Sequence, residues 1–353
     1  MYPMKTRLGN IALLLFLLPA LLCAGCRRAE HPASPQVSFL VSASPDVASK
    51  ATLYSGALAA ASGEGLGIVA YRYGSTGAEA SAWTLHSSPA VVKAVYDGSR
   101  GDYTSKWAPL PAERLMWPGD GWFVRFFAYF PYGATGVSVE AATGEAPVLS
   151  YTVQAPASQT DLLVSSAAST AERSGDPSWQ ELDVPLVMVH ALTGVRFRVP
   201  AELDITSVTL SGVHDSGSID LSGNPLAWTG QSGSASYQLG PLSLGSGLHA
   251  ETARPGYNIL DNDKILLLMP QTLPSGAKIN VELGDGRSIA ASIAGTAWLP
   301  GKLLTYTVTS AEILDLTLTV TDFEDIIWDR TGNTFEDYDW DDGTVNKFEG
   351  FKW

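Results

Sequence analysis

Cysteine is almost absent from this chain of 353 residues. The two thiols, Cys23 and Cys26, both lie near the N-terminus, and none follows. Without later cysteines there is no disulfide framework, no cysteine nucleophile and no thiolate set for zinc. The five histidines are scattered, no H-E-x-x-H motif occurs, and "GQSGS" at residue 230 lacks the spacing of a nucleophile elbow. We therefore expect neither an enzyme nor a bound cofactor.

Positive charge is also scarce. The chain has 22 basic and 36 acidic residues, which gives a formal net charge of −14. Such a chain repels the phosphate backbone, so nucleic acid is not an expected partner. Long hydrophobic runs are equally rare, because a single stretch near the N-terminus approaches the length needed to cross a bilayer.

That stretch, "IALLLFLLPALLCAGC", covers residues 11–26 and follows Lys5 and Arg7. Its length, positive flank and small final residues are typical of an export signal. Ala24 and Gly25 before Cys26 resemble a bacterial lipobox, in which the cysteine thiol receives a diacylglyceryl group; Cys23 stands where that motif usually has leucine. We expect residues 1–25 to be the signal, and lipid on Cys26 to anchor the protein to the outer membrane. Loss of the signal leaves 20 basic and 36 acidic residues, a net charge of −16.

The remaining sequence has the composition and patterning of an all-β protein. It is rich in glycine and proline and has few apolar residues at helical spacing. Apolar strand-like segments, separated by Gly, Pro, Ser and Asp clusters, begin at Val37, Leu66, Trp122, Val208, Lys264, Leu304 and Leu314. Short strands at this spacing predict β-sandwiches, and about 300 mature residues exceed one sandwich. We therefore expect an N-terminal segment (26–50), two tandem sandwiches (51–183 and 184–321) and a C-terminal extension (322–353).

The C-terminal extension is acidic and aromatic. Asp337, Asp339 and Asp341 alternate as the first ligands of a calcium loop do. The loop positions that require glycine and a bidentate glutamate hold Asp342 and Phe348 instead. The three aspartates are therefore a weak calcium candidate, and a solvated acidic tail is the favoured interpretation.

Six further segments, in this order, resemble the Bacteroidetes fimbrillins, type V pilins that are exported as lipoproteins. They are Trp107, "WPGDGWFVRFFAYFPYG" from Trp117, "QTDLLVSSA" from Gln159, "VPLVMVHALTGVRFRV" from Val184, "LLLMPQTL" from Leu266 and "WLPGKLLTYTV" from Trp298. The resemblance implies two transthyretin-like sandwiches and a subunit of a cell-surface fimbrium that contributes to adhesion. Expected partners are other pilin subunits, the outer membrane through lipid, and a host or bacterial surface ligand. The alternative is a lipid-anchored surface protein that binds a glycan or host ligand and does not polymerise.

The resemblance also implies assembly by proteolytic trimming and strand exchange. The strand to be removed would be "QVSFLVS" from Gln36, and the candidate cleavage lies between Lys50 and Ala51. The family usually has arginine there, so Lys50 indicates a lysine-tolerant protease, a subunit that is never trimmed, or no cleavage site. The segment after Cys26 also lacks the acid-rich run that resembles a surface-export signal in this phylum.

The candidate donor strand places Leu314, Leu316, Leu318 and Val320 on one face, with aspartate and threonine on the other. The competing interpretation is that this segment is the last strand of the second sandwich. The sequence leaves both open, because the segment from Leu304 already offers a closing strand.

Overall fold

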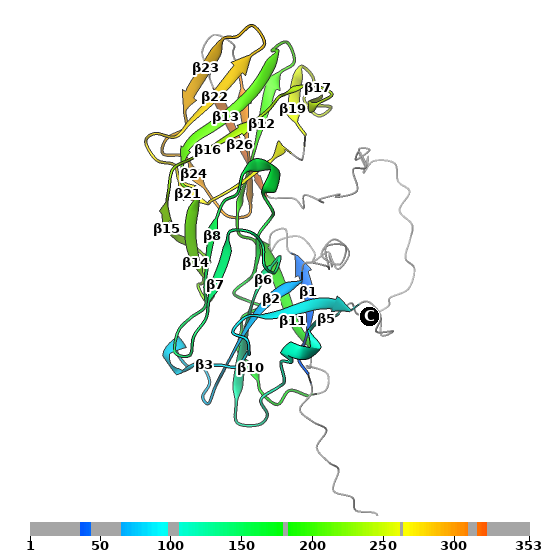
Figure 1. Ribbon diagram of the computed structural model, residues 1–353, viewed down its shortest axis with the longest axis vertical. Helices are drawn as coiled ribbons and strands as arrows, with labels where there is room; N and C mark the ends of the chain where they lie inside the picture. Colours follow the sequence, from blue (N-terminus) through cyan, green and yellow to red (C-terminus); the bar gives the residue numbers. More distant parts are fainter. Residues whose placement is uncertain are drawn as a thin grey trace, which may run out of the picture.

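The computed structural model describes residues 36–43, 65–97, 106–178, 183–261, 264–309 and 316–322. Regular structure in these residues consists of β-strands and three single-turn 3-10 helices, Ala80–Ala82, Pro111–Glu113 and Pro156–Ser158. The strands form two groups along the long axis of an elongated molecule (Figure 1). The expected all-β class is confirmed.

Seven strands of the N-terminal half form a closed ring. Pairing runs in the order β2, β4, β5, β1, β11, β9 and β6, and β6 then pairs with β2. The seven are β1 (Ser38–Ala43), β2 (Leu66–Tyr73), β4 (Val92–Asp97), β5 (Lys106–Pro109), β6 (Phe123–Phe130), β9 (Leu163–Ser165) and β11 (Asp183–His190). The short strands β3 (Thr84–Leu85) and β10 (Arg173–Ser174) add to β2 and β6. The sequence predicted a sandwich here; the seven-residue β2–β6 ladder instead closes the sheet on itself.

The ring encloses its own hydrophobic core. Alternate residues of its strands point inward and are buried, among them Phe39, Ile68, Phe126 and Leu186. The other face of β2 and β6 is buried too, because Val69, Phe127 and neighbouring residues belong to a second core outside the ring. β6 is therefore covered on both faces, as the continuous apolar run at its C-terminal end indicates.

A four-stranded sheet is built from both halves of the chain. β7 (Val137–Glu140) and β8 (Val148–Thr152) precede the ring's last strand in sequence, and β14 (Ser216–Asp220) and β15 (Trp228–Ser232) follow it. β8 and β14 pair antiparallel over five residues. In Figure 1 this sheet runs along the long axis beside the ring and towards the second group of strands. Its buried residues, such as Leu149 and Ile219, belong to the core that also packs on β2 and β6.

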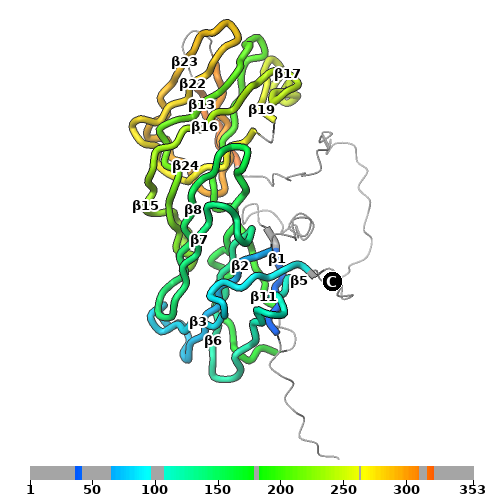
Figure 2. The backbone as a smooth tube through the Cα atoms, in the orientation of Figure 1, coloured from blue at the N-terminus to red at the C-terminus, as the bar shows by residue number. Residues whose placement is uncertain are grey.

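The C-terminal half is a sandwich of two sheets. One is β17 (Ser243–Leu244), β18 (Gly247–Ala250), β19 (Tyr257–Leu260), β12 (Thr193–Pro200), β25 (Lys302–Val308) and β26 (Leu316–Asp322), with β20 (Leu266–Leu268) also on β12. The other is β16 (Ala235–Leu239), β13 (Ile205–Val213), β22 (Lys278–Leu283) and β23 (Ser288–Ser292). The pair β21 (Gln271–Thr272) and β24 (Ala297–Trp298) completes this half. The backbone traced in Figure 2 passes from green at β12 to orange at β26 within this group.

The change of sheet along the chain comes later than the sequence suggested. A second sandwich was expected to begin at residue 184, yet β11 pairs in parallel with β1 over six residues and antiparallel with β9. The next strand, β12, is the first in the C-terminal sandwich. A boundary consistent with this pairing follows His190, and the division into two domains stays a prediction. Among the described residues, no helix is long and apolar enough to span a bilayer.

Candidate functional site

The position of β1 in the ring is a slot lined by apolar side chains. Val37, directly before the strand, and Phe39 and Val41 within it alternate and point inward, with 0%, 0% and 5% exposure. The Phe39 ring meets the Phe126 ring edge to face, with centroids 5.5 Å apart. Three alternate apolar side chains therefore fill this part of the core, as the period of a strand requires.

The two sides of this slot hold β1 differently. Towards β11 the ladder is complete, and Ser38 Oγ donates a hydrogen bond to Asp183 Oδ1. Towards β5 the ladder contains the single pair Phe39 and Trp107. Beside it, Val37 N donates to the Leu115 carbonyl over 2.8 Å. Without β1, the edges of β11 and β5 would face each other unpaired across an apolar cleft, an arrangement that favours an incoming strand.

The C-terminal sandwich is closed by β25. This strand pairs in parallel with β12, and Leu304, Tyr306 and Val308 are buried in the core. Tyr306 accepts a hydrogen bond from Trp298 Nε1 over 3.0 Å, and burial raises the pKa of its phenol. β25 is therefore an integral strand of the core.

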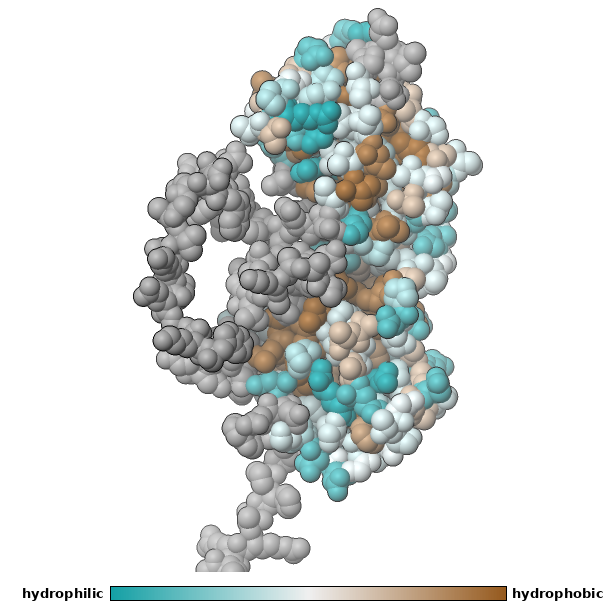
Figure 3. Space-filling model, turned by 180° about the vertical axis from the view of Figure 1, so that it is seen from behind, coloured by the Kyte–Doolittle hydropathy of each residue, from teal (hydrophilic) through white to brown (hydrophobic). Residues whose placement is uncertain are grey.

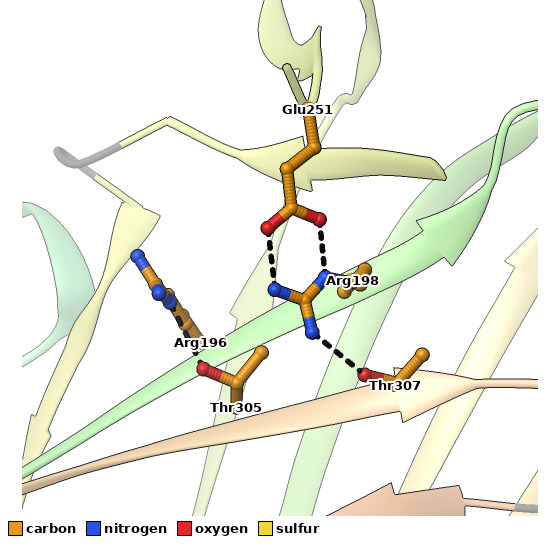
Figure 4. A network of polar contacts seen from close by, with 5 residues as sticks. All are labelled: Arg196, Arg198, Glu251, Thr305 and Thr307. Carbon is orange, nitrogen blue, oxygen red and sulfur yellow. Dashed lines mark hydrogen bonds and ion pairs between the residues drawn. The ribbon is translucent and has the colours of Figure 1, made fainter. Parts of the chain in front are cut away.

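A polar network fixes the opposite face of β25 to β12 (Figure 4). Arg198 makes a bidentate ion pair with Glu251 and donates from Nη1 to Thr307 Oγ1 over 3.3 Å. Two residue pairs along the ladder, Arg196 Nε donates to Thr305 Oγ1 over 3.0 Å. Arg198 and Glu251 are 11% and 12% exposed, so two nearly buried charges neutralise each other here.

β26 lies on the free edge of β25 and is much less buried. It pairs with β25 over seven residues, and no other described strand pairs with it. Leu316, Leu318 and Val320 share the face of the β25 core residues, because they lie opposite Val308, Tyr306 and Leu304. Leu316 packs against the core, whereas Leu318 is 39% and Val320 53% exposed. The strand thus presents apolar side chains that its own sandwich does not cover.

The structure brings together three of the predicted site residues and leaves the others undescribed. Leu316, Leu318 and Val320 form one face of β26, as the alternation predicted. The remaining candidates lie outside the described residues: Cys26, Lys50, Ala51, Leu314, Asp337, Asp339 and Asp341. In the part of the chain that is described, no group of three His, Cys, Asp or Glu side chains is arranged to hold a metal ion.

The fimbrillin-like family model matches residues 56–322, which is most of the chain. The chain belongs to the fimbrillin-like family. This is a family of fimbrial proteins and not of enzymes. The match includes both the ring strands from β2 onward and β26.

The solved structures that match the chain include proteins from Bacteroides and Porphyromonas species. A proposed cell adhesion protein from Bacteroides ovatus ATCC 8483 is 15% identical, with a TM-score of 0.49, over 83% of this chain and 99% of its own. A proposed cell adhesion protein from Bacteroides uniformis ATCC 8492 is 15% identical, with a TM-score of 0.48, over 82% and 98%. The fimbrial anchor protein Mfa2 from Porphyromonas gingivalis is 12% identical, with a TM-score of 0.41, over 82% and 95%. No curated protein matches the chain.

The residues that line the β1 slot were the part of the site that sequence analysis missed. Leu186 and Met188 come from β11, whose run "VPLVMVH" was expected to belong to the second sandwich. Both faces of β11 carry valine, leucine or methionine. Such a continuous apolar run is typical of a parallel strand, and this signal pointed to a parallel neighbour such as β1.

Proposed function

We propose that this fimbrillin-like protein is a fimbrial subunit that is anchored by lipid on Cys26, trimmed after Lys50 and assembled by strand exchange. In this scheme trimming removes β1, and the strand from Leu314 to Val320 of a neighbouring subunit enters the vacated slot. One observation carries the proposal. β26 exposes apolar residues at the period-two spacing with which β1 fills the ring.

The side chains on the two strands support this exchange. β1 places Val37, Phe39 and Val41 inside the ring, and β26 offers Leu318 and Val320, which are largely uncovered in their own sandwich. Each apolar side chain that moves from water into the slot contributes about 1.5 to 3 kcal/mol. The backbone of the donor would also complete the ladders of β11 and β5. These gains favour the exchanged state.

The cost of releasing β26 is limited by β25. β25 already closes the C-terminal core and is held to β12 by a ladder and by the bonds of Arg196 and Arg198. Detaching β26 therefore exposes Leu316 and one edge of β25, while Leu304, Tyr306 and Val308 stay packed on the core. This asymmetry favours β26 as the donor strand over the interpretation that it is an indispensable strand of the sandwich.

Trimming of the purified precursor tests the scheme. Digestion after Lys50 should yield a chain that begins at Ala51, followed by a ladder of polymers that resists mild SDS. Lys50→Ala should remain full length and form no SDS-resistant ladder, and Leu318→Asp should be trimmed but fail to donate its strand.

A trimmed wild-type chain that never forms a ladder would refute strand exchange. It would support the alternative of a lipid-anchored surface binding protein. Anchoring is tested separately by palmitate labelling, in which Cys26→Ser should lose the label and Cys23→Ser should keep it.

A further inference from the structure

The outer edge of β26 lacks the features that keep sheet edges from pairing with other chains. Its sequence, LTLTVTD from Leu316 to Asp322, contains no proline, glycine or lysine. Its ladder with β25 has no bulge, and it is the terminal strand of its sheet among the described residues. Natural proteins protect an edge with these devices, so an edge without them is a template for another strand.

The side chains beside this edge are compatible with such pairing. Thr317, Thr319 and Thr321 are exposed on one face, and Leu318 and Val320 are exposed on the other. In Figure 3 the hydrophobic areas of the visible face gather in the middle of the long axis and above it, while both ends are mostly hydrophilic. Among the exposed large hydrophobic side chains of the described residues, Leu318 and Val320 are the two that share a strand.

We propose that β26 pairs antiparallel with β26 of a second copy of this chain, around a two-fold axis at Leu318. In this register Leu318 lies opposite the partner's Leu318, and Leu316 lies opposite the partner's Val320. Thr317 then lies opposite the partner's Thr319. The seven-stranded sheets of the two copies become one continuous sheet across the axis.

The strand is complementary to itself in this register, which identifies a second copy as the occupant. Leu316, Leu318 and Val320 of both copies meet on one face, and threonines pair with threonines on the other. The one charged residue of the strand, Asp322, lies outside the five residues, Leu316 to Val320, that this register pairs. A shift of one residue would place each leucine opposite a threonine and invert the faces. A two-fold interface of this kind needs one self-complementary patch, which this strand supplies.

Charge substitutions on the threonine face test both the interface and its register. The test form is the chain from Arg27 to Trp353, which retains every described residue and has no cysteine. It should sediment as a dimer at micromolar concentrations. Thr317→Lys combined with Thr319→Lys places lysines opposite each other twice, and should raise the dimer dissociation constant about tenfold or more.

The matched control is Thr317→Lys combined with Thr319→Glu. It alters the same two exposed positions but places opposite charges across the axis, so the dimer should persist. Equal dissociation constants for the two double variants would overturn the proposal. A wild-type chain that stays monomeric at about 100 μM would also overturn it, because an interface of standard size would be populated at that concentration. Circular dichroism of both variants checks that the fold is intact.

Crosslinking of single cysteines provides a second measurement that needs no loss of folding stability. Thr319→Cys places the two thiols two residues apart along the paired strands, about 7 Å, and Thr321→Cys separates them by about 20 Å. A short bis-maleimide should therefore link Thr319→Cys efficiently and Thr321→Cys poorly. The reverse result would contradict the register.

The dimer does not depend on the proposed strand exchange, and the two can fail separately. Edge pairing is limited to two copies and dissociates in SDS, whereas strand exchange produces an open-ended ladder that resists it. The lysine pair lies on the threonine face, which a donor strand would turn outward, so it should weaken the dimer about tenfold or more and leave donation intact.

Discussion

At the scale of single residues, one aromatic ring determines what position 67 can accommodate. Gly67 on β2 lies opposite Tyr129 on β6, and a Cβ added at Gly67 would lie 2.0 Å from the Tyr129 ring. We expect Gly67→Ala to lower the free energy of unfolding by about 1 to 3 kcal/mol, because the buried ring has to move within a packed core. Urea denaturation measures this change.

Gly74 supplies the control for that substitution. It follows the end of β2, and a Cβ added there meets no atom within 4 Å. Gly74→Ala should be neutral or stabilising by up to about 1 kcal/mol, because alanine restricts the unfolded chain. Equal effects of the two substitutions would contradict the steric account of Gly67.

His86 is a residue whose ionisation should affect folding stability. Its Nε2 lies 2.7 Å from the Met116 carbonyl, so the neutral ring donates a hydrogen bond there. Burial lowers the pKa of His86, the positive charge of Arg72 lowers it further, and the hydrogen bond partly opposes the shift. Because the folded state disfavours the proton, its contribution to stability is complete above the unfolded pKa of about 6.5 and is lost as the pH falls towards the folded pKa.

The test for His86 is a comparison of stability against pH. Wild type should lose stability between about pH 6.5 and the folded pKa, and His86→Gln should be less stable at neutral pH but show a shallower loss on acidification. Parallel curves for the two proteins would show that His86 is not the responsible group.

At the scale of elements, β25 and β26 are adjacent strands with very different burial. Tyr306 of β25 is 2% exposed, and Leu318, its partner on β26, is 39% exposed. We expect Tyr306→Ala to cost about 3 to 5 kcal/mol and Leu318→Ala less than about 1.5 kcal/mol. Thermal unfolding of both variants measures the difference, and similar losses would make β26 an integral strand of the sandwich.

The strands themselves were largely predictable from the sequence, because each carries its own period-two or continuous apolar signal. The segments beginning at Val37, Leu66, Trp122, Leu304 and Leu314 correspond to β1, β2, β6, β25 and β26. The neighbours of each strand were not predictable. Whether β11 joins β1 or the C-terminal sandwich depends on contacts between residues about 145 positions apart, such as Ser38 and Asp183. Local periodicity does not identify the neighbour of a strand. For the same reason the donor face of the candidate site could be read from the sequence, while the slot lined by Trp107, Phe126 and Leu186 could not.

At the scale of the whole molecule, the two halves are joined by more than the chain between β11 and β12. β8 and β14 pair across the junction, and Trp228 Nε1 donates to the Ala191 carbonyl over 2.6 Å. Leu267 N also donates to Gln159 Oε1 over 2.8 Å, which links two segments 108 residues apart. The second core is continuous from Val69 and Phe127 of the ring strands to Tyr306 of β25. A sequence divided at residue 183 gives no indication of this shared sheet, because β8 and β14 are short and half polar.

The continuous core predicts that the two halves unfold together. The unmodified protein should show one transition, with coincident midpoints for probes in each half and equal calorimetric and van't Hoff enthalpies.

Leu149 on β8 faces Ile219 on β14 across the junction, and both are buried. The double variant Leu149→Ala, Ile219→Ala should lower the free energy of unfolding by several kcal/mol. Because the lost contacts join the two halves, the variant should also unfold in two transitions instead of one. Leu248→Ala is the control, since Leu248 is equally buried but belongs to the sheet of the C-terminal half. It should lower the midpoint of a transition that stays single. Two transitions in the unmodified protein would mean that the shared sheet does not couple the halves, and a single transition in the double variant would place the coupling in other contacts of the common core.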